Sequence, residues 1–378
     1  MIIRQAKVYS ADHKFRLGDI QITDGRITGT AEVIAASDGE EIIEAHGLYA
    51  IPGLVDIHEH GAMGYDYCDA TEEALSAIAE YEASQGVMAV CATTMTLSEE
   101  ALSKVADAVA AHRNEKGADI VGINLEGPFV SAEKLGAQNP DYLALPDAAM
   151  IRRINERAKG SVRLLDLAPE LKGAIECIAE LKEEMVLSVA HTSCDYQTAA
   201  KAFAAGADHL THLYNAMPSL HHREPGPIAA GAEAKADAEL ICDGVHVHPA
   251  MVRLAFGLFG EEHIVMISDS MRACGLKDGV YDLGGQEVRV TGSRAELVRD
   301  PNTIAGGATN LYRCMKTAVQ KMDIPLEQAI RAASENPARS IGVEKDYGSI
   351  APGRYGNIIL CDKELEIQKV IQKGVVIR

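Results

Sequence analysis

The sequence has no tryptophan and only 5 phenylalanines among its 378 residues. Proteins that stack single-stranded bases use aromatic side chains, so this scarcity argues against such a platform. Positive charge is sparse as well: 36 basic residues stand against 55 acidic ones, and the net charge is −19. A strongly acidic surface repels nucleic acids and anionic membranes. We therefore expect neither of them as a partner.

Long apolar runs and closely spaced cysteine pairs are also missing. No stretch approaches the roughly 20 apolar residues that a membrane span needs. The first residues, Met1–Lys7, lack the apolar centre of a signal peptide. The 8 cysteines include no C-x-x-C pair, so we expect reduced residues that pack mainly in the core. Together these absences predict a cytoplasmic protein.

Both ends of the chain have the pattern of short β-strands. Ile20–Thr23 and Arg26–Thr28 flank Asp24-Gly25, a dipeptide typical of a tight hairpin turn. Strand-like runs recur near the C-terminus, at residues 347–350, 357–360 and 370–371. We expect one small β-sandwich domain formed by residues 1–52 and 345–378.

Residues 53–344 alternate apolar strands with amphipathic helices. The eight expected strands are Gly53–His60, Gly86–Met95, Asp119–Phe129, Val162–Glu170, Met185–Ser193, His209–Met217, Ala238–His246 and His263–Met271. Helices are expected at Glu72–Ser84, Glu99–Arg113, Gly173–Glu184 and Tyr196–Ala205. Buried-type strands with helical crossovers predict a parallel (β/α)8 TIM barrel. The connection after the sixth strand looks short and irregular, and Gly275–Gly306 looks like an inserted hairpin.

Polar residues gather where the expected strands end: His58 and His60, Glu126, His191, His212 and Asp269. In a barrel these ends open on one face, where active sites are built. The period of two places His58 and His60 on the same side of their strand. Imidazoles with a carboxylate suit zinc or a similar divalent ion. Glu126 has two oxygens with which to bridge two ions, and Asp269 is the natural general base.

Each of these residues has a simpler interpretation on its own. A single histidine at a strand end is more often a hydrogen-bonded structural residue than a ligand, Glu126 resembles a helix cap or ion-paired carboxylate, and Asp269 resembles a turn residue. Their joint position at one rim weakens that alternative. The histidines outside the pattern are expected to be structural: His13, His46, His112, His209 and His263.

Longer motifs narrow the interpretation. They are Leu125–Phe129, Lys134–Ala137, Thr211–Met217, His221–Gly226, Asp243–His246, Ser268–Arg272 and Gly275–Gly279. In this order, spread over nearly the whole chain, they resemble the N-acetylglucosamine-6-phosphate deacetylase family of the amidohydrolase superfamily. The resemblance implies hydrolysis of N-acetyl-D-glucosamine 6-phosphate to D-glucosamine 6-phosphate and acetate.

The resemblance also implies roles for individual residues. The principal metal falls to Glu126, His191 and His212, and a second one to His58 and His60, a pair that some family members have lost. The cofactor is then one or two divalent ions per subunit, with zinc first and iron, manganese or cobalt as alternatives. The catalytic carboxylate falls on Asp269.

Substrate contacts are implied at a further set of residues: Ala137, Gln138, Asn215, Ala216, Arg223, His246, Ile304, Ala305 and Gly306. Family members are commonly homodimers, so Arg223 is expected to reach the phosphate in the neighbouring subunit. Gln138 departs from the histidine of many members and cannot carry charge. The departure leaves open an N-acetylgalactosamine-6-phosphate deacetylase. Cyclic-amide hydrolysis and a catalytically inactive barrel scaffold are the more distant alternatives.

Overall fold

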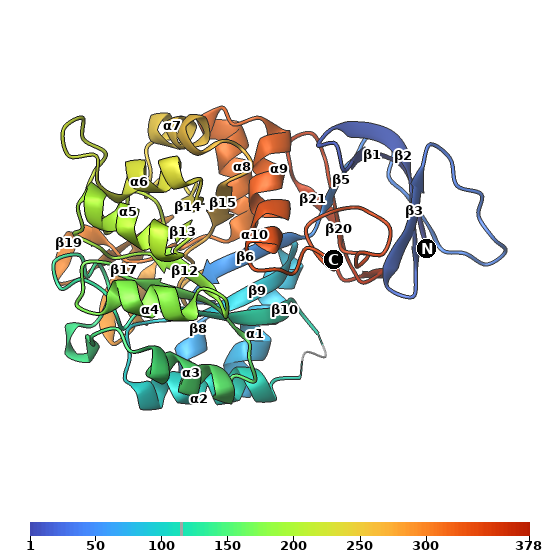
Figure 1. The fold of residues 1–378 in the computed structure, drawn as a ribbon. Coiled ribbons are helices and arrows are strands. Elements are labelled where there is room, and N and C mark those ends of the chain that lie inside the picture. Colours follow the sequence, from blue (N-terminus) through green and yellow to red (C-terminus); the bar gives the residue numbers. More distant parts are fainter. Residues whose placement is uncertain (114–115) are drawn as a thin grey trace.

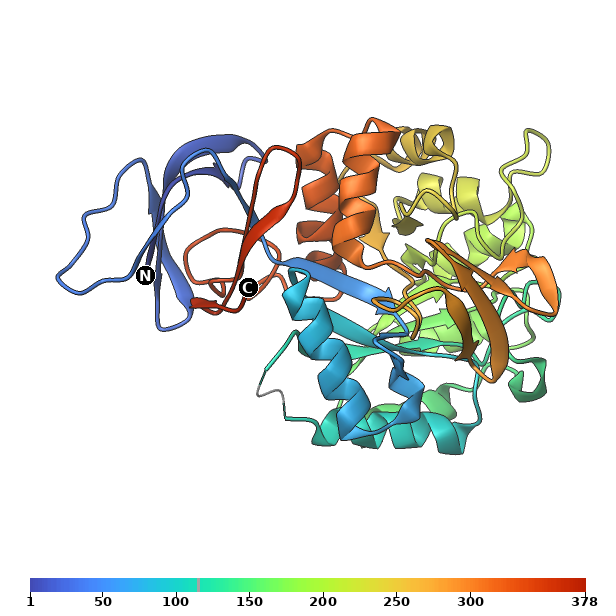
Figure 2. The ribbon, with the colours of Figure 1, turned by 180° about the vertical axis from the view of Figure 1, so that it is seen from behind.

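Both chain ends lie in one small β-domain at the side of a larger barrel (Figures 1 and 2). The computed structural model describes residues 1–113 and 116–378. One hydrogen-bonded sheet joins the strands of the β-domain, which are β1 (Ile2–Tyr9), β2 (Phe15–Thr23), β3 (Arg26–Ala31), β4 (Ile42–Glu44), β5 (Tyr49–Pro52), β20 (Ile358–Cys361), β21 (Ile367–Gln372) and β22 (Val375–Val376).

The β-domain confirms that the two termini fold together. Asp24 and Gly25, with φ of 50° and 76°, turn the chain between β2 and β3, as a two-residue hairpin turn requires. Its core takes Ile20 from the N-terminal strands and Ile358 from the C-terminal ones. The strand expected at residues 347–350 is wrong, because Gly348 has a φ of 84° and the chain bends there.

The barrel follows the expected order. Its parallel strands are β6 (Leu54–Glu59), β9 (Val87–Thr94), β10 (Asp119–Glu126), β11 (Val162–Leu167), β12 (Val186–Val189), β13 (His209–Leu210), β14 (Asp237–Ile241) and β15 (Ile264–Ile267). Each strand pairs with the next along the chain. The Asp269 N–H donates to the His58 carbonyl at 3.0 Å and ties the last strand to the first. The predicted (β/α)8 barrel is therefore confirmed.

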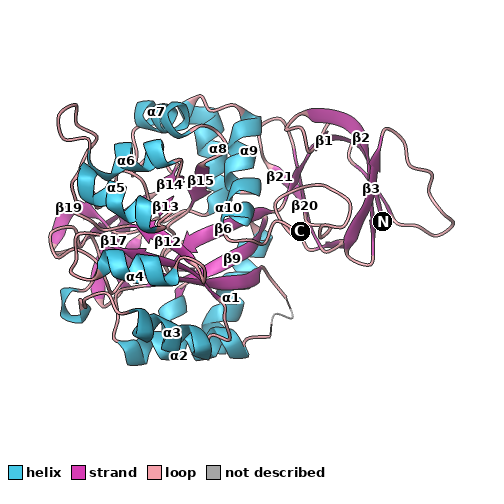
Figure 3. Cartoon of the chain, in the orientation of Figure 1, coloured by secondary structure: helices cyan, strands magenta, loops and turns pink. Residues whose placement is uncertain are grey.

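Helices cover the outside of the barrel (Figure 3). They are α1 (Glu72–Ser84), α2 (Glu99–Ala111), α3 (Ala148–Arg157), α4 (Ala174–Leu181), α5 (Tyr196–Ala205), α6 (Gly226–Ala234), α7 (Pro249–Phe259), α8 (Leu311–Met322), α9 (Leu326–Ala333) and α10 (Glu335–Ser340). Ranges α1 and α5 match the sequence-based expectation. In the part of the chain that the structure describes, no helix is both long and apolar enough to cross a membrane.

The connection after the sixth strand was expected to be irregular, but it contains α6. This helix consists largely of glycine and alanine, so it has no clear polar face from which to predict it. Small residues are needed where it packs, because a Cβ at Gly231 would lie 2.3 Å from Leu210 Cδ1.

The inserted segment is larger than one hairpin. It forms a four-stranded antiparallel sheet, β16 (Gly279–Leu283), β17 (Gln286–Thr291), β18 (Arg294–Leu297) and β19 (Asp300–Ile304). Its apolar face packs with Met95, Ala137 and Met271, which lie at the C-terminal ends of the barrel strands. The inserted sheet thus stands beside the rim on which the polar residues were expected. The remaining short elements are β7 (Gly61–Ala62), β8 (Tyr65–Asp66), η1 (Tyr67–Asp69) and η2 (Pro140–Tyr142).

Several barrel strands end earlier than expected. His191, His212 and Asp269 each lie two residues beyond the last residue of their strand. Their φ angles are 42°, 29° and 49°, in the left-handed region that an extended strand cannot contain. These three residues therefore stand on the first turn of the loop, where strain is commonly stored at functional sites.

Candidate metal centre and substrate cavity

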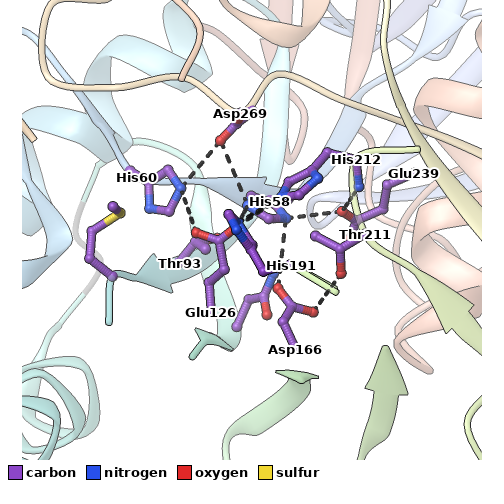
Figure 4. A network of polar contacts seen from close by, with 12 residues as sticks. His58, His60, Thr93, Glu126, Asp166, His191, Thr211, His212, Glu239 and Asp269 are labelled. Carbon is purple, nitrogen blue, oxygen red and sulfur yellow. Dashed lines mark hydrogen bonds and ion pairs between the residues drawn. The ribbon is translucent and has the colours of Figure 1, made fainter. Parts of the chain in front are cut away.

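Five polar side chains from four barrel strands meet at the C-terminal rim (Figure 4). His58 lies in β6 and His60 directly follows it, while Glu126 is the last residue of β10. Two sets of three have ligand atoms within 4.8 Å of one another. We call His58, His60 and Glu126 the strand group, and Glu126, His191 and His212 the loop group. Glu126 belongs to both.

The loop group has the spacing of a metal site. The Nε2 atoms of His191 and His212 lie 3.1 and 3.0 Å from Glu126 Oε1 and 3.2 Å from each other. Two ligands of a tetrahedral zinc ion lie about 3.4 Å apart, so the spacing fits. Backbone carbonyls take the other ring nitrogens: His191 Nδ1 bonds Lys134 O and His212 Nδ1 bonds Asn215 O. Both Nε2 lone pairs are thereby left for an ion.

The strand group is slightly wider. The Nε2 atoms of His58 and His60 each lie 3.4 Å from one oxygen of Glu126. Asp269 Oδ1 is 3.2 Å from His60 Nε2 and 3.7 Å from His58 Nε2. His58 Nε2 is buried and has no hydrogen-bond partner among the residues that the structure describes. A buried polar atom without a partner calls for one, and a divalent ion between these groups would provide it.

The electrostatics of the rim favour cations. Burial alone would raise the pKa of Glu126, but His58 and the neighbouring imidazoles outweigh it and hold that pKa well below its usual range. The pKa of Asp269 is lowered in the same way, by His60 and His58 against burial. Burial would lower the pKa of His60, yet Asp269 and Glu126 raise it to about 10. The carboxylates stay ionised in a place that water barely reaches.

A cavity of about 330 Å³ opens onto both groups, a size typical of small-ligand sites. Seven of the expected substrate residues line it: Ala137, Gln138, Asn215, Ala216, His246, Ile304 and Gly306. Ala305 is fully buried behind the wall. Arg223 is exposed on the protruding loop between β13 and α6 (Figure 1), where its Nη1 lies 2.7 Å from His222 Nε2. Within one chain Arg223 does not line this cavity.

Sequence reasoning missed several lining residues: Met95, Glu133, Lys134, Leu283, Asn302 and Thr303. Lys134 belongs to the motif Lys134–Ala137, so the sequence did offer a reason to expect it at the site. Leu283, Asn302 and Thr303 come from the inserted sheet, whose alternating strands contain no chemical motif.

His246 lines the cavity, and the carboxylate of Asp243 binds the other side of its ring. Asp243 Oδ2 lies 2.8 Å from His246 Nδ1, and Asp243 Oδ1 accepts the backbone N–H groups of Val245 and His246. Burial would lower the pKa of His246, but the hydrogen bond and charge of Asp243 outweigh it and raise that pKa. The raised pKa favours the imidazolium form of His246, which can donate a hydrogen bond into the cavity.

Gln138 has partners of its own. Its Nε2 donates to Glu126 Oε2 at 2.5 Å and its Oε1 accepts the Thr96 N–H at 2.7 Å. The backbone carbonyls of Ala137 and Gln138 accept from Gln286 Nε2 in the inserted sheet. The Gln138 amide thus orients Glu126, while the sugar contact expected from the sequence stays a prediction.

One buried acid near the centre was not singled out from the sequence. Glu239, in β14, lies 2.9 Å from His58 Nδ1 through its Oε2. The available signal was an ionisable residue in the four-residue stretch Ala238–Ile241, whose other three residues are apolar. Asp166 of β11 is a similar case, because it accepts from Thr211 Oγ1 at 2.8 Å.

Comparison with known proteins agrees with this geometry. Residues 49–377 match the amidohydrolase family. An N-acetylglucosamine-6-phosphate deacetylase of Bacillus subtilis (strain 168) is 34% identical, over 99% of this chain and 96% of that protein. An N-acetylgalactosamine-6-phosphate deacetylase of Escherichia coli O157:H7 is 33% identical, over 96% of this chain and 94% of that protein.

Solved structures agree as well. A mutant N-acetyl-D-glucosamine-6-phosphate deacetylase from Mycobacterium smegmatis, in complex with N-acetyl-D-glucosamine-6-phosphate, superposes with a TM-score of 0.92 at 31% identity. The match covers 100% of this chain and 98% of that chain. Fold, rim and sequence therefore agree: the chain belongs to the amidohydrolase family, in the group of the N-acetylglucosamine-6-phosphate deacetylases.

Proposed function

We propose that this protein hydrolyses the acetamide of N-acetyl-D-glucosamine 6-phosphate and releases D-glucosamine 6-phosphate and acetate. The observation that carries the proposal is the convergence of both ligand groups and Asp269 on one cavity of about 330 Å³. The relatives that cover nearly the whole chain support the choice of substrate.

The ligand groups provide the electrophilic chemistry. Glu126, His191 and His212 would hold the principal ion and His58 with His60 a second one, as the separations of their nitrogen and oxygen atoms allow. A divalent ion supplies a water whose pKa falls toward about 7 and polarises a carbonyl oxygen. We propose zinc, with iron, manganese or cobalt as alternatives.

Asp269 carries the proton in this proposal. Its carboxylate is ionised and buried beside His60, so it accepts a proton from the attacking water. The same proton passes to the amide nitrogen as the C–N bond breaks, which converts a poor leaving group into an amine. The water oxygen ends in acetate, and the reaction is balanced without another reactant.

The remaining cavity residues bind and orient the sugar. His246 donates to an oxygen of the substrate, and Asn215, Ala216, Ala137 and the Ile304–Gly306 segment hold the ring and the acyl group. Lys134 adds a positive charge to the wall. Arg223 suits a phosphate because its guanidinium makes permanent bidentate contacts. Since it lies outside this chain's own cavity, we propose that it serves the partner subunit of a homodimer.

Three attributes complete the proposal. We propose a cytoplasmic location and a boundary between the β-domain, residues 1–52 and 345–378, and the barrel, residues 53–344. N-acetylgalactosamine 6-phosphate is the second candidate substrate, because a relative with that activity is 33% identical over 96% of the chain.

Acetate release tests the proposal. The metal-loaded protein is given N-acetylglucosamine 6-phosphate, N-acetylgalactosamine 6-phosphate or unphosphorylated N-acetylglucosamine, with and without a chelator. We expect the fastest release from the first sugar, little from the last, and none after chelation until zinc is restored. A faster reaction with the galactosamine compound would establish the second candidate. No acetate from either phosphorylated sugar would reject the proposal.

A further inference from the structure

Glu239 is fully buried beneath the ligand groups, and it contacts both of them. Its Oε2 accepts from His58 Nδ1 at 2.9 Å and from the His212 backbone N–H at 3.1 Å (Figure 4). The ion pairs formed by Glu239 within residues 1–113 and 116–378 are with two histidines, His58 and His209. No lysine or arginine of that part of the chain forms an ion pair with it.

In this buried position the ionised form of Glu239 is unfavourable in free energy unless a positive charge lies close to it. A buried carboxylate is stabilised only by a close countercharge and good hydrogen bonds. Its closest partner is the His58 ring, which donates from Nδ1. A divalent ion on the opposite nitrogen, Nε2, would polarise the ring and strengthen that donation, as in carboxylate–histidine–metal arrangements. Glu239 and an ion bound to His58 therefore stabilise each other.

The same contact sets the direction of the His58 ring. Because Nδ1 is bound to Glu239, the tautomer is fixed and the lone pair remains on Nε2. Within residues 1–113 and 116–378 that nitrogen has no hydrogen-bond partner, and it lies 3.4 Å from Glu126 Oε1 and 3.7 Å from Asp269 Oδ1. Glu239 thus aims a free lone pair between two carboxylates.

The other histidine of the strand group has no comparable support among the described residues. His60 Nδ1 is buried without a hydrogen-bond partner among the described residues. The loop group, in contrast, has backbone carbonyls behind both rings. Among the histidines of the strand group, only His58 is therefore oriented by a side chain behind its ring, and that side chain is Glu239.

We propose that Glu239 is the positioning residue of the strand group and decides whether the protein holds a second ion. The inference deepens the proposed function, since it concerns the metal content of the same site. Removing the charge of Glu239 should weaken the second ion about 10- to 100-fold, the usual cost of losing such a partner of a metal ligand. The ion of the loop group should remain.

Metal content tests the proposal directly. Apo-protein is titrated with zinc and the bound ions per chain are counted; manganese-loaded samples are then examined by EPR for the signal of a coupled pair. We expect two ions and a coupled signal in the wild type, but one tightly bound ion and no coupling in E239Q. The matched control is D237N, two residues earlier in β14, whose carboxylate pairs with His263 and Arg339 away from the rim. It should keep both ions.

Two further variants guard against a folding defect. E239D keeps the charge but withdraws it by one methylene, so the second ion should weaken while the melting temperature changes little. In an H58N background, E239Q should cause no further loss of metal. Two ions at wild-type affinity in E239Q or E239D, a wild type that binds a single ion, or loss of both ions in E239Q would each overturn the proposal. If the counts change as expected but the wild type releases no acetate, only the proposed function fails.

Discussion

The two ligand groups of this barrel share Glu126 but are built in different ways. In the loop group, His191 and His212 stand on left-handed backbone just past their strands, and main-chain carbonyls bind the back of each ring. In the strand group, His58 lies within strand β6, where the pairing with β9 shifts its register, and a carboxylate binds the back of its ring. One group is oriented by backbone and the other by a side chain.

This difference predicts which substitutions disturb the ligand geometry of each group. A carbonyl of the main chain survives any substitution that leaves the loop folded, so the loop group should tolerate changes around it. The strand group should lose its geometry when a single side chain changes. Substitutions at Asp269, Asp243 and Asn215 should therefore have effects that decrease in this order.

Asp269 stands at the open side of the strand group, and its replacement separates chemistry from binding. We expect D269N to lower kcat by about 10²- to 10⁴-fold, the usual contribution of a general acid–base group. Metal content should stay at the wild-type value, because the histidines and Glu126 remain. Steady-state acetate release together with metal analysis measures both. A variant that loses an ion would make Asp269 a ligand of the strand group instead.

His246 is also supported by a side chain, so Asp243 should matter in a pH-dependent way. The pKa of His246 is raised in the folded protein, so its contribution to stability is present below the unfolded pKa of about 6.5. It is lost as the pH rises through the folded pKa. D243N should therefore lower the free energy of unfolding more at pH 6 than at pH 9, by roughly 1–2 kcal/mol at the lower pH.

Urea denaturation of wild type and D243N at the two pH values gives this comparison. An equal loss of stability at both would show that the Asp243–His246 charge pair contributes nothing. Metal content serves as the control, because neither residue belongs to a ligand group.

Replacing Asn215 should give the smallest effect of the three substitutions. Its carbonyl binds His212 Nδ1 at 3.2 Å, and N215A keeps that carbonyl. Its side chain donates to His212 O and Leu213 O, so we expect a loss of about 1 kcal/mol in stability. The zinc affinity of the loop group should remain within about threefold of wild type, less than the loss caused by a missing side-chain partner of a metal ligand. Competition with a zinc chelator checks this, and a tenfold loss would contradict the backbone-supported picture.

The barrel was predictable because its signals are repetitive. Eight apolar runs alternate with helical patterns, and polar residues at their ends must meet once the strands are parallel. The topology alone predicts that five residues lie together: His58, His60, Glu126, His191 and His212. Their separation in the sequence is irrelevant once the topology is known.

Other features depend on contacts that no local pattern encodes. The small residues of α6 pack against α5 and β13 and so lack an amphipathic period, and the inserted sheet lines the cavity with ordinary residues such as Leu283 and Thr303. The sequence shows Glu239 only as an acidic residue within a strand, and its contact with His58 becomes apparent in the folded structure. The early strand ends were also hidden, because histidine and aspartate adopt a positive φ only occasionally.

The left-handed backbone at His191, His212 and Asp269 has a consequence for engineering. Glycine and asparagine accept that conformation more readily than histidine does. A thermostability screen without an activity assay should therefore enrich these two amino acids at His191 and His212. Such a screen would select proteins with a higher melting temperature that no longer turn over substrate, as expected from the trade-off between stability and activity.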